Sequence, residues 1–250
     1  MSENKRIIIV GATSAIAEHC ARLWVQQTNV ELILIVRNKN KAEPIVDDLR
    51  VRNSQAIIRV LETNFNNPVI IQQLVNTITE EGMIDTVLIA HGSLPDQLTC
   101  QQDLIACQEA LTINGISPVL FAEAFANTME KANKGTLAII GSVAGDRGRK
   151  SNYIYGAAKG MVTRYAQGLQ HRLANTGVKV VLIKPGPTDT PMTAHLKQQG
   201  AKLAKVEDVA KQIVNSINQG KPIVYAPAKW ALIMLIIRHL PRFIFNKMNI

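Results

Sequence analysis

The feature that most constrains the fold lies near the start of the chain, where a short apolar run meets a glycine turn. Residues 6–10 read RIIIV, and such a β-branched run predicts a strand that is buried on both faces. Gly11 follows it, and a helical pattern then continues to about residue 26. Strand, tight turn and helix in this order cradle a pyrophosphate, because free N–H groups at the helix N-terminus face it. The sequence therefore predicts a nucleotide-binding α/β fold.

Further short apolar runs recur along the chain, with helical patterns between them. They lie at residues 31–36, 56–61, 86–90, 135–140, 179–183 and 223–225. This alternation predicts a doubly wound parallel sheet of about seven strands with helices on both faces. A chain of 250 residues is long enough for one such domain, so we expect a single Rossmann-type domain over residues 1–250.

A second motif, GSVAGDRGRKSNYIYGAAK, occupies residues 141–159 and follows the run at 135–140. Ser142 comes just past the carboxyl end of that strand, where open α/β sheets bind their ligands. Tyr155 and Lys159 are four residues apart in a helical segment, so their side chains share one face. A phenol has an ordinary pKa of about 10, and a nearby ammonium favours the phenolate and lowers it. These residues predict an acid–base site in which Tyr155 donates a proton to a carbonyl oxygen held by Ser142.

Ser142, Tyr155 and Lys159 at this spacing, together with the N-terminal turn, resemble the short-chain dehydrogenase/reductase family over nearly the whole chain. That family reduces carbonyls or oxidises alcohols with NAD(H) or NADP(H), and usually adds an Asn, which Asn114 in TINGIS matches. The resemblance implies an NAD(P)-dependent enzyme in which Lys159 also binds the nicotinamide ribose. Gly115 next to Asn114 weakens a helix, so we expect a local kink that frees Asn114 for a proton relay.

The turn itself departs from the family pattern Gly-x-x-x-Gly-x-Gly. The chain keeps Gly11 but has Ala15 and Ala17 at the other two positions. We expect the two extra methyl groups to hold the cofactor further out or to shift the turn. This departure is the main support for a rival interpretation, a nucleotide-binding sensor or scaffold without turnover.

The strand at residues 31–36 ends in Val36 and Arg37, where an acidic residue would normally hold the ribose hydroxyls of NAD. Arg37 could pair with a 2′-phosphate through a bidentate fork, which favours NADP(H) and leaves NAD(H) possible. The alternative is that Arg37 and the cations that follow it are only solvent-exposed residues of a loop. The resemblance implies a full set of cofactor-binding residues: Gly11, Thr13, Ser14, Ile16, Arg37, Asn64, Phe65, Ala90, Tyr155, Lys159, Pro185, Gly186, Thr188 and Thr190.

Two further segments border the expected site. Residues 192–205 should form a mobile substrate flap, and we expect His195 within it to be solvated rather than catalytic. His91 replaces the middle residue of the family's Asn-Ala-Gly, and we expect a packing histidine there. No metal site is expected, because the sequence has no ligand spacing for one.

Three cations lie between the catalytic serine and tyrosine, at Arg147, Arg149 and Lys150. At the rim of the substrate mouth they could bind the phosphate of a substrate. The alternative is a solvated loop.

The C-terminal segment, residues 229–248, combines apolar and basic groups. Residues 230–237 read WALIMLII, which is too short for a bilayer that needs about 20 residues. Trp230, Phe243 and Phe245 could enter a headgroup region, and flanking cations favour an anionic surface: Lys229, Arg238, Arg242 and Lys247. The segment therefore predicts an in-plane membrane contact or a lipid-tail groove. Docking on the domain or on a subunit partner is the alternative.

A closer likeness within the family is carried by AGDRGRKSNYIYGAAKG, by MTAHLK and by the tail YAPAKWALIMLIIRHLPRFIFNKM. These stretches resemble the reductases that convert a keto-pentose on a polyprenyl phosphate to the arabinose form during cell-envelope synthesis. The likeness implies a lipid-linked substrate at the membrane surface. A cytosolic reductase of a small carbonyl compound is the alternative.

Composition limits the partners and the compartment. The net charge is +9, but no helix-turn-helix, zinc or aromatic–basic motif supports nucleic-acid binding. Cys20, Cys100 and Cys107 make an odd count that suits a reducing cytoplasm, and no signal peptide is expected. We expect a cytoplasmic homo-oligomer, with peripheral contact to the inner face of the membrane.

Overall fold

The computed structural model describes residues 4–27 and 29–248, and within them the strands form one seven-stranded sheet. The strand order is β3-β2-β1-β4-β5-β6-β7 and every neighbouring pair is parallel. The predicted Rossmann-type sheet is therefore confirmed. The strands are β1 Lys5–Val10, β2 Val30–Val36, β3 Ile57–Glu62, β4 Thr86–Ile89, β5 Gly135–Ile140, β6 Val178–Pro185 and β7 Ile223–Ala226.

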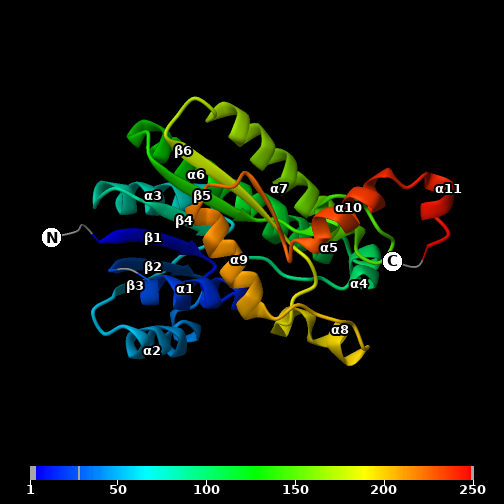
Figure 1. The fold of residues 1–250 in the computed structure, drawn as a ribbon, viewed down its shortest axis with the longest axis horizontal. Helices are drawn as coiled ribbons and strands as arrows, with labels where there is room; N and C mark the ends of the chain where they lie inside the picture. The colour runs from blue at the N-terminus through cyan, green and yellow to red at the C-terminus, as the bar shows by residue number, and fades with distance from the viewer. Residues whose placement is uncertain (1–3, 28, 249–250) are drawn as a thin grey trace.

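Helices cover both faces of the sheet (Figure 1). One layer holds α1 (Ala15–Gln27), α2 (Glu43–Arg52) and α9 (Val206–Asn218). The other holds α3 (Pro68–Glu80), α6 (Ser117–Ala132) and α7 (Tyr153–Arg172). Strand β1 shows why an unbroken apolar run is needed between two layers. Ile7 and Ile9 face the first core, Ile8 and Val10 face the second, and all four are fully buried.

The strand order reverses direction between β1 and β4, which opens a crevice at their carboxyl ends. The loops after β1, β4, β5 and β6 gather around this crevice and carry the predicted site residues. Short helices stand at the same end of the sheet in Figure 1: α4 (Gln97–Gln102), α5 (Leu104–Leu111), α8 (Ala194–Gln198), α10 (Lys229–His239) and α11 (Arg242–Phe245).

The expected kink at Asn114–Gly115 is present as a π-helical turn, Thr112–Ile116, between α5 and α6. The continuous helical run Leu104–Ala132 is long and apolar enough to cross a membrane by length and composition alone. Its inner face, however, packs on the sheet through the fully buried Phe121 and Phe125. The α6 part of the run therefore belongs to the layer that covers the sheet.

A buried ion pair joins the loop after β5 to strands β6 and β7. Lys184 Nζ on β6 lies 2.5 Å from Asp146 Oδ1, and the two side chains are 3% and 2% exposed. Tyr225 on β7 donates its hydroxyl to the other Asp146 oxygen at 2.7 Å. Asp146 follows Ser142 closely and Lys184 precedes Pro185, so this cluster fixes two loops that border the crevice.

Candidate active site

The turn after β1 has the backbone of a phosphate-binding turn. Gly11 has a φ of +80°, and a Cβ there would lie 2.5 Å from the His91 Cβ, so only glycine fits. The expectation that both alanines displace the cofactor is wrong for Ala17, because α1 turns its methyl group into the core. Ala15 does border the cavity beside Gly11. The departure from the family pattern is therefore milder than the sequence suggests.

A first cavity extends from this turn to the end of β2. It is bordered by Gly11, Thr13, Ser14, Ile16, Arg37, Lys41 and Phe65, among others. Asn64, which was also expected to contact the cofactor, is not among the residues that line this cavity: its Oδ1 accepts the N–H of Asn66 at 2.9 Å in an exposed turn, and its cofactor contact stays a prediction. Arg37 and Lys41 are both exposed at the rim, so two cations are available to an anionic group there.

His91 lies behind this turn as a neutral, buried ring. Ser117 Oγ donates to the Phe65 carbonyl at 2.7 Å, so it must accept from His91 Nε2, which lies 2.9 Å away. Phe65 and Phe121 contact the imidazole edge to face. Burial lowers the pKa of His91 to about 3, with the charges of Lys159 and Arg37 acting in the same direction. The expected packing role of His91 fits these contacts.

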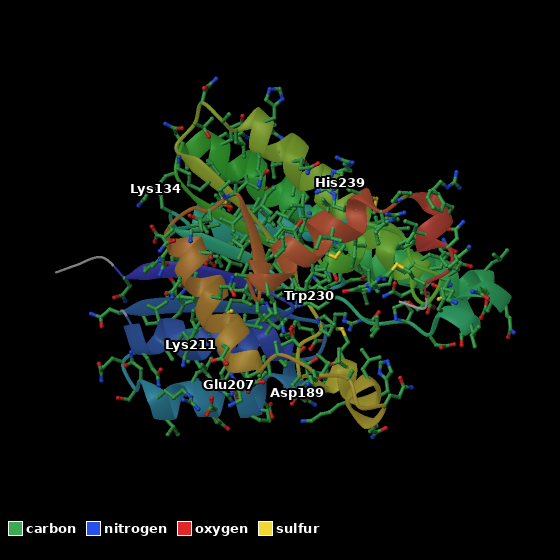
Figure 2. The ribbon with its side chains drawn as sticks, turned by 45° about the vertical axis from the view of Figure 1, so that its right-hand side comes forward. Lys134, Asp189, Glu207, Lys211, Trp230 and His239 are labelled. Carbon is green, nitrogen blue, oxygen red and sulfur yellow. The ribbon has the colours of Figure 1, made fainter. Side chains whose placement is uncertain are left out.

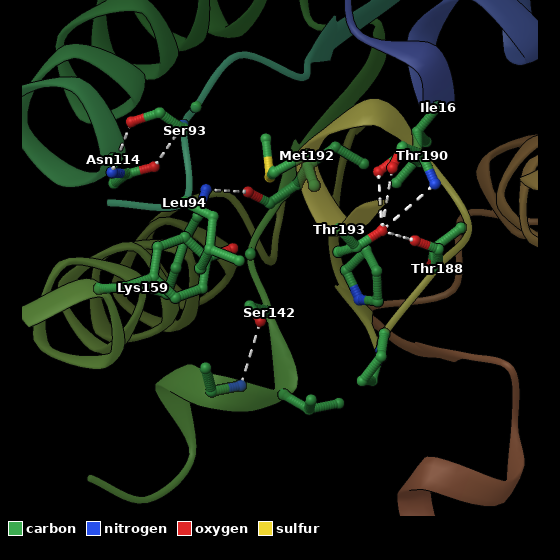
Figure 3. A pocket seen from close by; sticks show the side chains of 18 of the residues that line it. Ile16, Ser93, Leu94, Asn114, Ser142, Lys159, Thr188, Thr190, Met192 and Thr193 are labelled. Carbon is green, nitrogen blue, oxygen red and sulfur yellow. Dashed lines mark hydrogen bonds between the residues drawn. The ribbon is translucent and has the colours of Figure 1, made fainter. Parts of the chain in front are cut away.

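A second cavity brings the four predicted catalytic residues together, and Figure 3 shows three of them labelled. Ser142 follows β5, is buried, and its Oγ accepts the Ala144 N–H at 3.1 Å. Lys159 Nζ donates to the Ile140 carbonyl at 3.1 Å and lies 5.9 Å from the centre of the Tyr155 ring. Ala90 borders the same cavity. The structure places these residues as predicted, while their roles stay a prediction.

Asn114 is held by the loop that follows β4. Its Oδ1 accepts the Ser93 N–H at 2.9 Å and its Nδ2 donates to the Ala110 carbonyl at 2.9 Å, as Figure 3 shows for the Ser93 contact. The side chain is fully buried and borders the cavity with Lys159. Ser93 and Leu94 also border it and were missed from the sequence, since nothing in their residue types marks them.

The electrostatics of Tyr155 differ from the expectation. Burial raises the pKa of Tyr155, and hydrogen bonding to Ser142 and the charge of Arg149 oppose this only in part. The expected net lowering of the Tyr155 pKa by Lys159 is therefore wrong. Burial also lowers the pKa of Lys159, to about 8. The cation that acts on the Tyr155 hydroxyl here is Arg149.

The loop after β6 closes the other side of the cavity. Pro185, Gly186, Thr188 and Thr190 all border it, and Thr188 Oγ1 donates to the Gly186 carbonyl at 2.9 Å. The predicted flap lies beside them and contributes Met192, Thr193 and Leu196 to the wall. His195 is exposed and lies outside both cavities, as expected for a solvated residue.

The C-terminal segment packs directly against this loop. A Cβ on Gly186 would lie only 1.9 Å from Trp230 Nε1, so glycine is required for the indole to fit. Figure 2 shows Trp230 at the base of α10, where this helix meets the sheet. The expectation that Trp230 enters lipid is thus corrected, because its ring covers the loop expected to hold the nicotinamide.

Arg147 holds the same segment from the other side. Its Nη1 donates to the carbonyls of Ile237 and Leu240, and its guanidinium lies 3.7 Å from the centre of the Phe245 ring. The expectation that Arg147 binds a phosphate is therefore wrong, because its guanidinium is bound to the C-terminal segment. The expectation that Phe245 enters lipid is also corrected, because its ring packs against the Arg147 guanidinium. Lys150 is exposed and does not border the cavity. Of the three predicted phosphate-binding cations, Arg149 alone borders the cavity.

The fold and the crevice together are those of the Rossmann class, in which the crevice binds a dinucleotide. Residues 5–201 match the family model described as short chain dehydrogenase, so the chain belongs to that family, a class of NAD(P)-dependent enzymes. An uncharacterized oxidoreductase of Mycobacterium tuberculosis is 28% identical over 247 residues, which cover 97% of this chain and 96% of that protein.

Solved structures share the same fold. A short-chain dehydrogenase from Sphingobium yanoikuyae in complex with NADPH aligns with a TM-score of 0.81 and 20% identity, covering 95% of this chain and 97% of that one. A 3-oxoacyl-[acyl-carrier protein] reductase from Brucella melitensis in complex with NAD aligns with a TM-score of 0.80 and 18% identity, covering 93% and 99%. At these identities the likeness concerns the fold.

Proposed function

We propose that the protein is an NADPH-dependent ketone reductase that acts on a keto-pentose carried by a polyprenyl phosphate at a membrane surface. The observation that supports it is the meeting of Ser142, Tyr155, Lys159 and Asn114 at one cavity of a short chain dehydrogenase. A bound reduced nicotinamide supplies the hydride. Tyr155 donates its proton to the carbonyl oxygen, and Ser142 donates a hydrogen bond to the developing oxyanion.

The remaining residues support this proton transfer. Arg149, the cation that acts on the Tyr155 hydroxyl, stabilises the phenolate that is left, and Lys159, whose Nζ lies 5.9 Å from the centre of the Tyr155 ring, adds a second positive charge nearby. Asn114 orders water towards Lys159 and so reprotonates the site. A sensor without turnover would not need this complete set, which is why reduction is favoured over the rival. The product is an alcohol with one hydride and one proton added.

The cofactor proposal is NADP(H), with NAD(H) as the weaker ligand. Arg37 and Lys41 border the cavity at the end of β2, where the sequence carries no acidic residue to take ribose hydroxyls. One structural relative has NADPH bound and another NAD, so the fold accommodates either. The positive charges of Arg37 and Lys41 support a cofactor that carries a 2′-phosphate.

Replacing Arg37 with alanine is expected to weaken NADPH about 10- to 100-fold and to leave NADH unchanged, because a charge-assisted fork to the 2′-phosphate is lost. Fluorescence titration of both reduced cofactors measures this. Lys39→Ala removes a charge from the same loop without touching the cavity and serves as the control. Equal NADPH and NADH affinities in the unmodified protein would refute the assignment.

The membrane proposal rests on the outer face of α10 and α11. Five large apolar side chains are exposed there: Leu232, Leu235, Ile236, Phe243 and Ile244. Exposed cations flank them at Lys229, Arg238, Arg242 and Lys247. Anionic lipid headgroups complement this combination, and the apolar groups can enter the acyl boundary. Because Trp230 on the inner face covers Gly186, a chain held in lipid would lie next to the site.

Exchanging Leu235, Ile236 and Phe243 for glutamine is expected to reduce binding to anionic vesicles at least about tenfold, since exposed apolar area no longer enters the lipid. Sedimentation with vesicles measures the bound fraction. The double variant Val51→Gln and Val69→Gln alters two exposed valines on α2 and α3 and should pellet normally. The proposal fails if the unmodified protein does not pellet with the vesicles and analytical ultracentrifugation of the protein alone shows a dimer. A second copy of the chain would then cover this face.

A further inference from the structure

Arg149 stands apart from the other cations of its loop. It borders the same cavity as Ser142 and Tyr155, whereas Arg147 is bound to the C-terminal segment and Lys150 points to solvent. Its side chain is half-buried, and its Nε is fully buried. A cation of this kind must be neutralised by a partner or by a ligand.

The described residues offer Arg149 no such partner. Its buried Nε has no hydrogen-bond acceptor, and no carboxylate within residues 4–27 and 29–248 forms an ion pair with it. Asp146, the acid nearest in sequence, already binds Lys184 at 2.5 Å and Tyr225 at 2.7 Å. Burial accordingly lowers the pKa of Arg149. The guanidinium is thus an unneutralised cation facing the reaction site.

We infer that Arg149 forms a subsite for an anionic substituent, best a phosphate ester attached within a few atoms of the carbonyl that Tyr155 protonates. A guanidinium fork matches two phosphate oxygens at once, which fixes the orientation of the adjoining carbon. The position of the subsite beside Tyr155 requires the charge and the carbonyl to be near neighbours in one molecule. That the substrate carries a carbonyl next to Tyr155 rests on the proposed function. The anion subsite rests only on the burial and the surroundings of Arg149.

Two small ketones that differ by one phosphate test the subsite: dihydroxyacetone phosphate and dihydroxyacetone. Calorimetric titration into the protein saturated with NADP⁺ avoids turnover, so the result does not depend on catalysis. The unmodified protein should bind the phosphate ester about 10- to 100-fold tighter than dihydroxyacetone. Arg149→Ala should abolish that difference. Lys150→Ala, which removes a charge from the outer side of the same loop, should retain it.

Three results would overturn the inference. They are equal binding of the two ketones to the unmodified protein, an unchanged preference in Arg149→Ala, and a loss of NADP⁺ affinity in Arg149→Ala that places the guanidinium in the cofactor site. The first does not require any variant to fold. Arg149→Lys, which keeps the charge but not the fork, should recover part of the preference.

Discussion

Tyr155→Phe is expected to reduce ketone turnover about 10²- to 10⁴-fold while NADPH binding stays within about twofold of the unmodified protein. The phenyl ring preserves the packing of α7 against the cavity, and only the hydroxyl that donates the proton is lost. Neither of the two catalytic residues nearest to it is expected to replace it, because Ser142 is a far weaker acid and the Lys159 ammonium is bound to the Ile140 carbonyl. The loss should therefore appear in kcat rather than in cofactor affinity.

Tyr153→Phe is the matched control, because Tyr153 lies two residues before Tyr155 in α7 and is exposed. It should retain full activity. Steady-state oxidation of NADPH with a ketone substrate, together with fluorescence titration of NADPH, measures both quantities. A Tyr155→Phe variant with near-normal turnover would mean that another group is the acid, and the mechanism proposed for this site would fail.

The second large effect concerns stability. Asp146→Ala is expected to lower the free energy of unfolding by about 3–5 kcal/mol, because Lys184 would be left as an unpaired buried charge. Tyr225→Phe, which removes only the hydroxyl bonded to the Asp146 carboxylate, should cost less, about 1.5–3 kcal/mol. Urea titration compares the two variants directly. Similar losses in both would show that the ion pair contributes little beyond its hydrogen bond.

The ion pair also bears on function, since Asp146 lies in the loop of Ser142 and Lys184 directly precedes Pro185 and Gly186. Loosening it should widen the cavity between these loops. An activity loss in Asp146→Ala that exceeds its loss of folded protein would reveal this positioning effect. Tyr225→Phe should show none.

The fold could be predicted because its strands are local signals. Each strand of a sheet covered on both faces is an unbroken apolar run, and the run at 135–140 coincides with β5. The placement of Tyr155 and Lys159 was likewise predictable from a local signal, because a four-residue spacing on a helix places two side chains on one face. Asn114 and Gly115 marked a weak point in a helix, and a π-helical turn formed there.

The remaining features depend on contacts between distant residues. Lys184 and Tyr225 lie 38 and 79 residues from Asp146, and nothing in their neighbours pairs them. Trp230 packs against Gly186 because of the way α10 lies on the domain. The apolar residues of α10 follow one another without a break, so the sequence could not show which face of the helix is turned inward. Ala17 shows the same limit at short range, because the rotation of α1 decides whether a methyl group meets the cofactor or the core.

The central claim is reduction of a keto-sugar on a polyprenyl phosphate, and one turnover experiment tests it most directly. A polyprenyl-phosphate keto-pentose in anionic vesicles is incubated with the protein and NADPH, and the oxidised cofactor and the sugar product are quantified. We expect one NADPH oxidised per arabinose-configured product, with kcat/KM at least about 100-fold above that for the free keto-pentose, since the phosphate and the chain contribute binding energy. Reduction of the free sugar at an equal or higher kcat/KM, or no NADPH oxidation with the lipid-linked sugar, would contradict the claim.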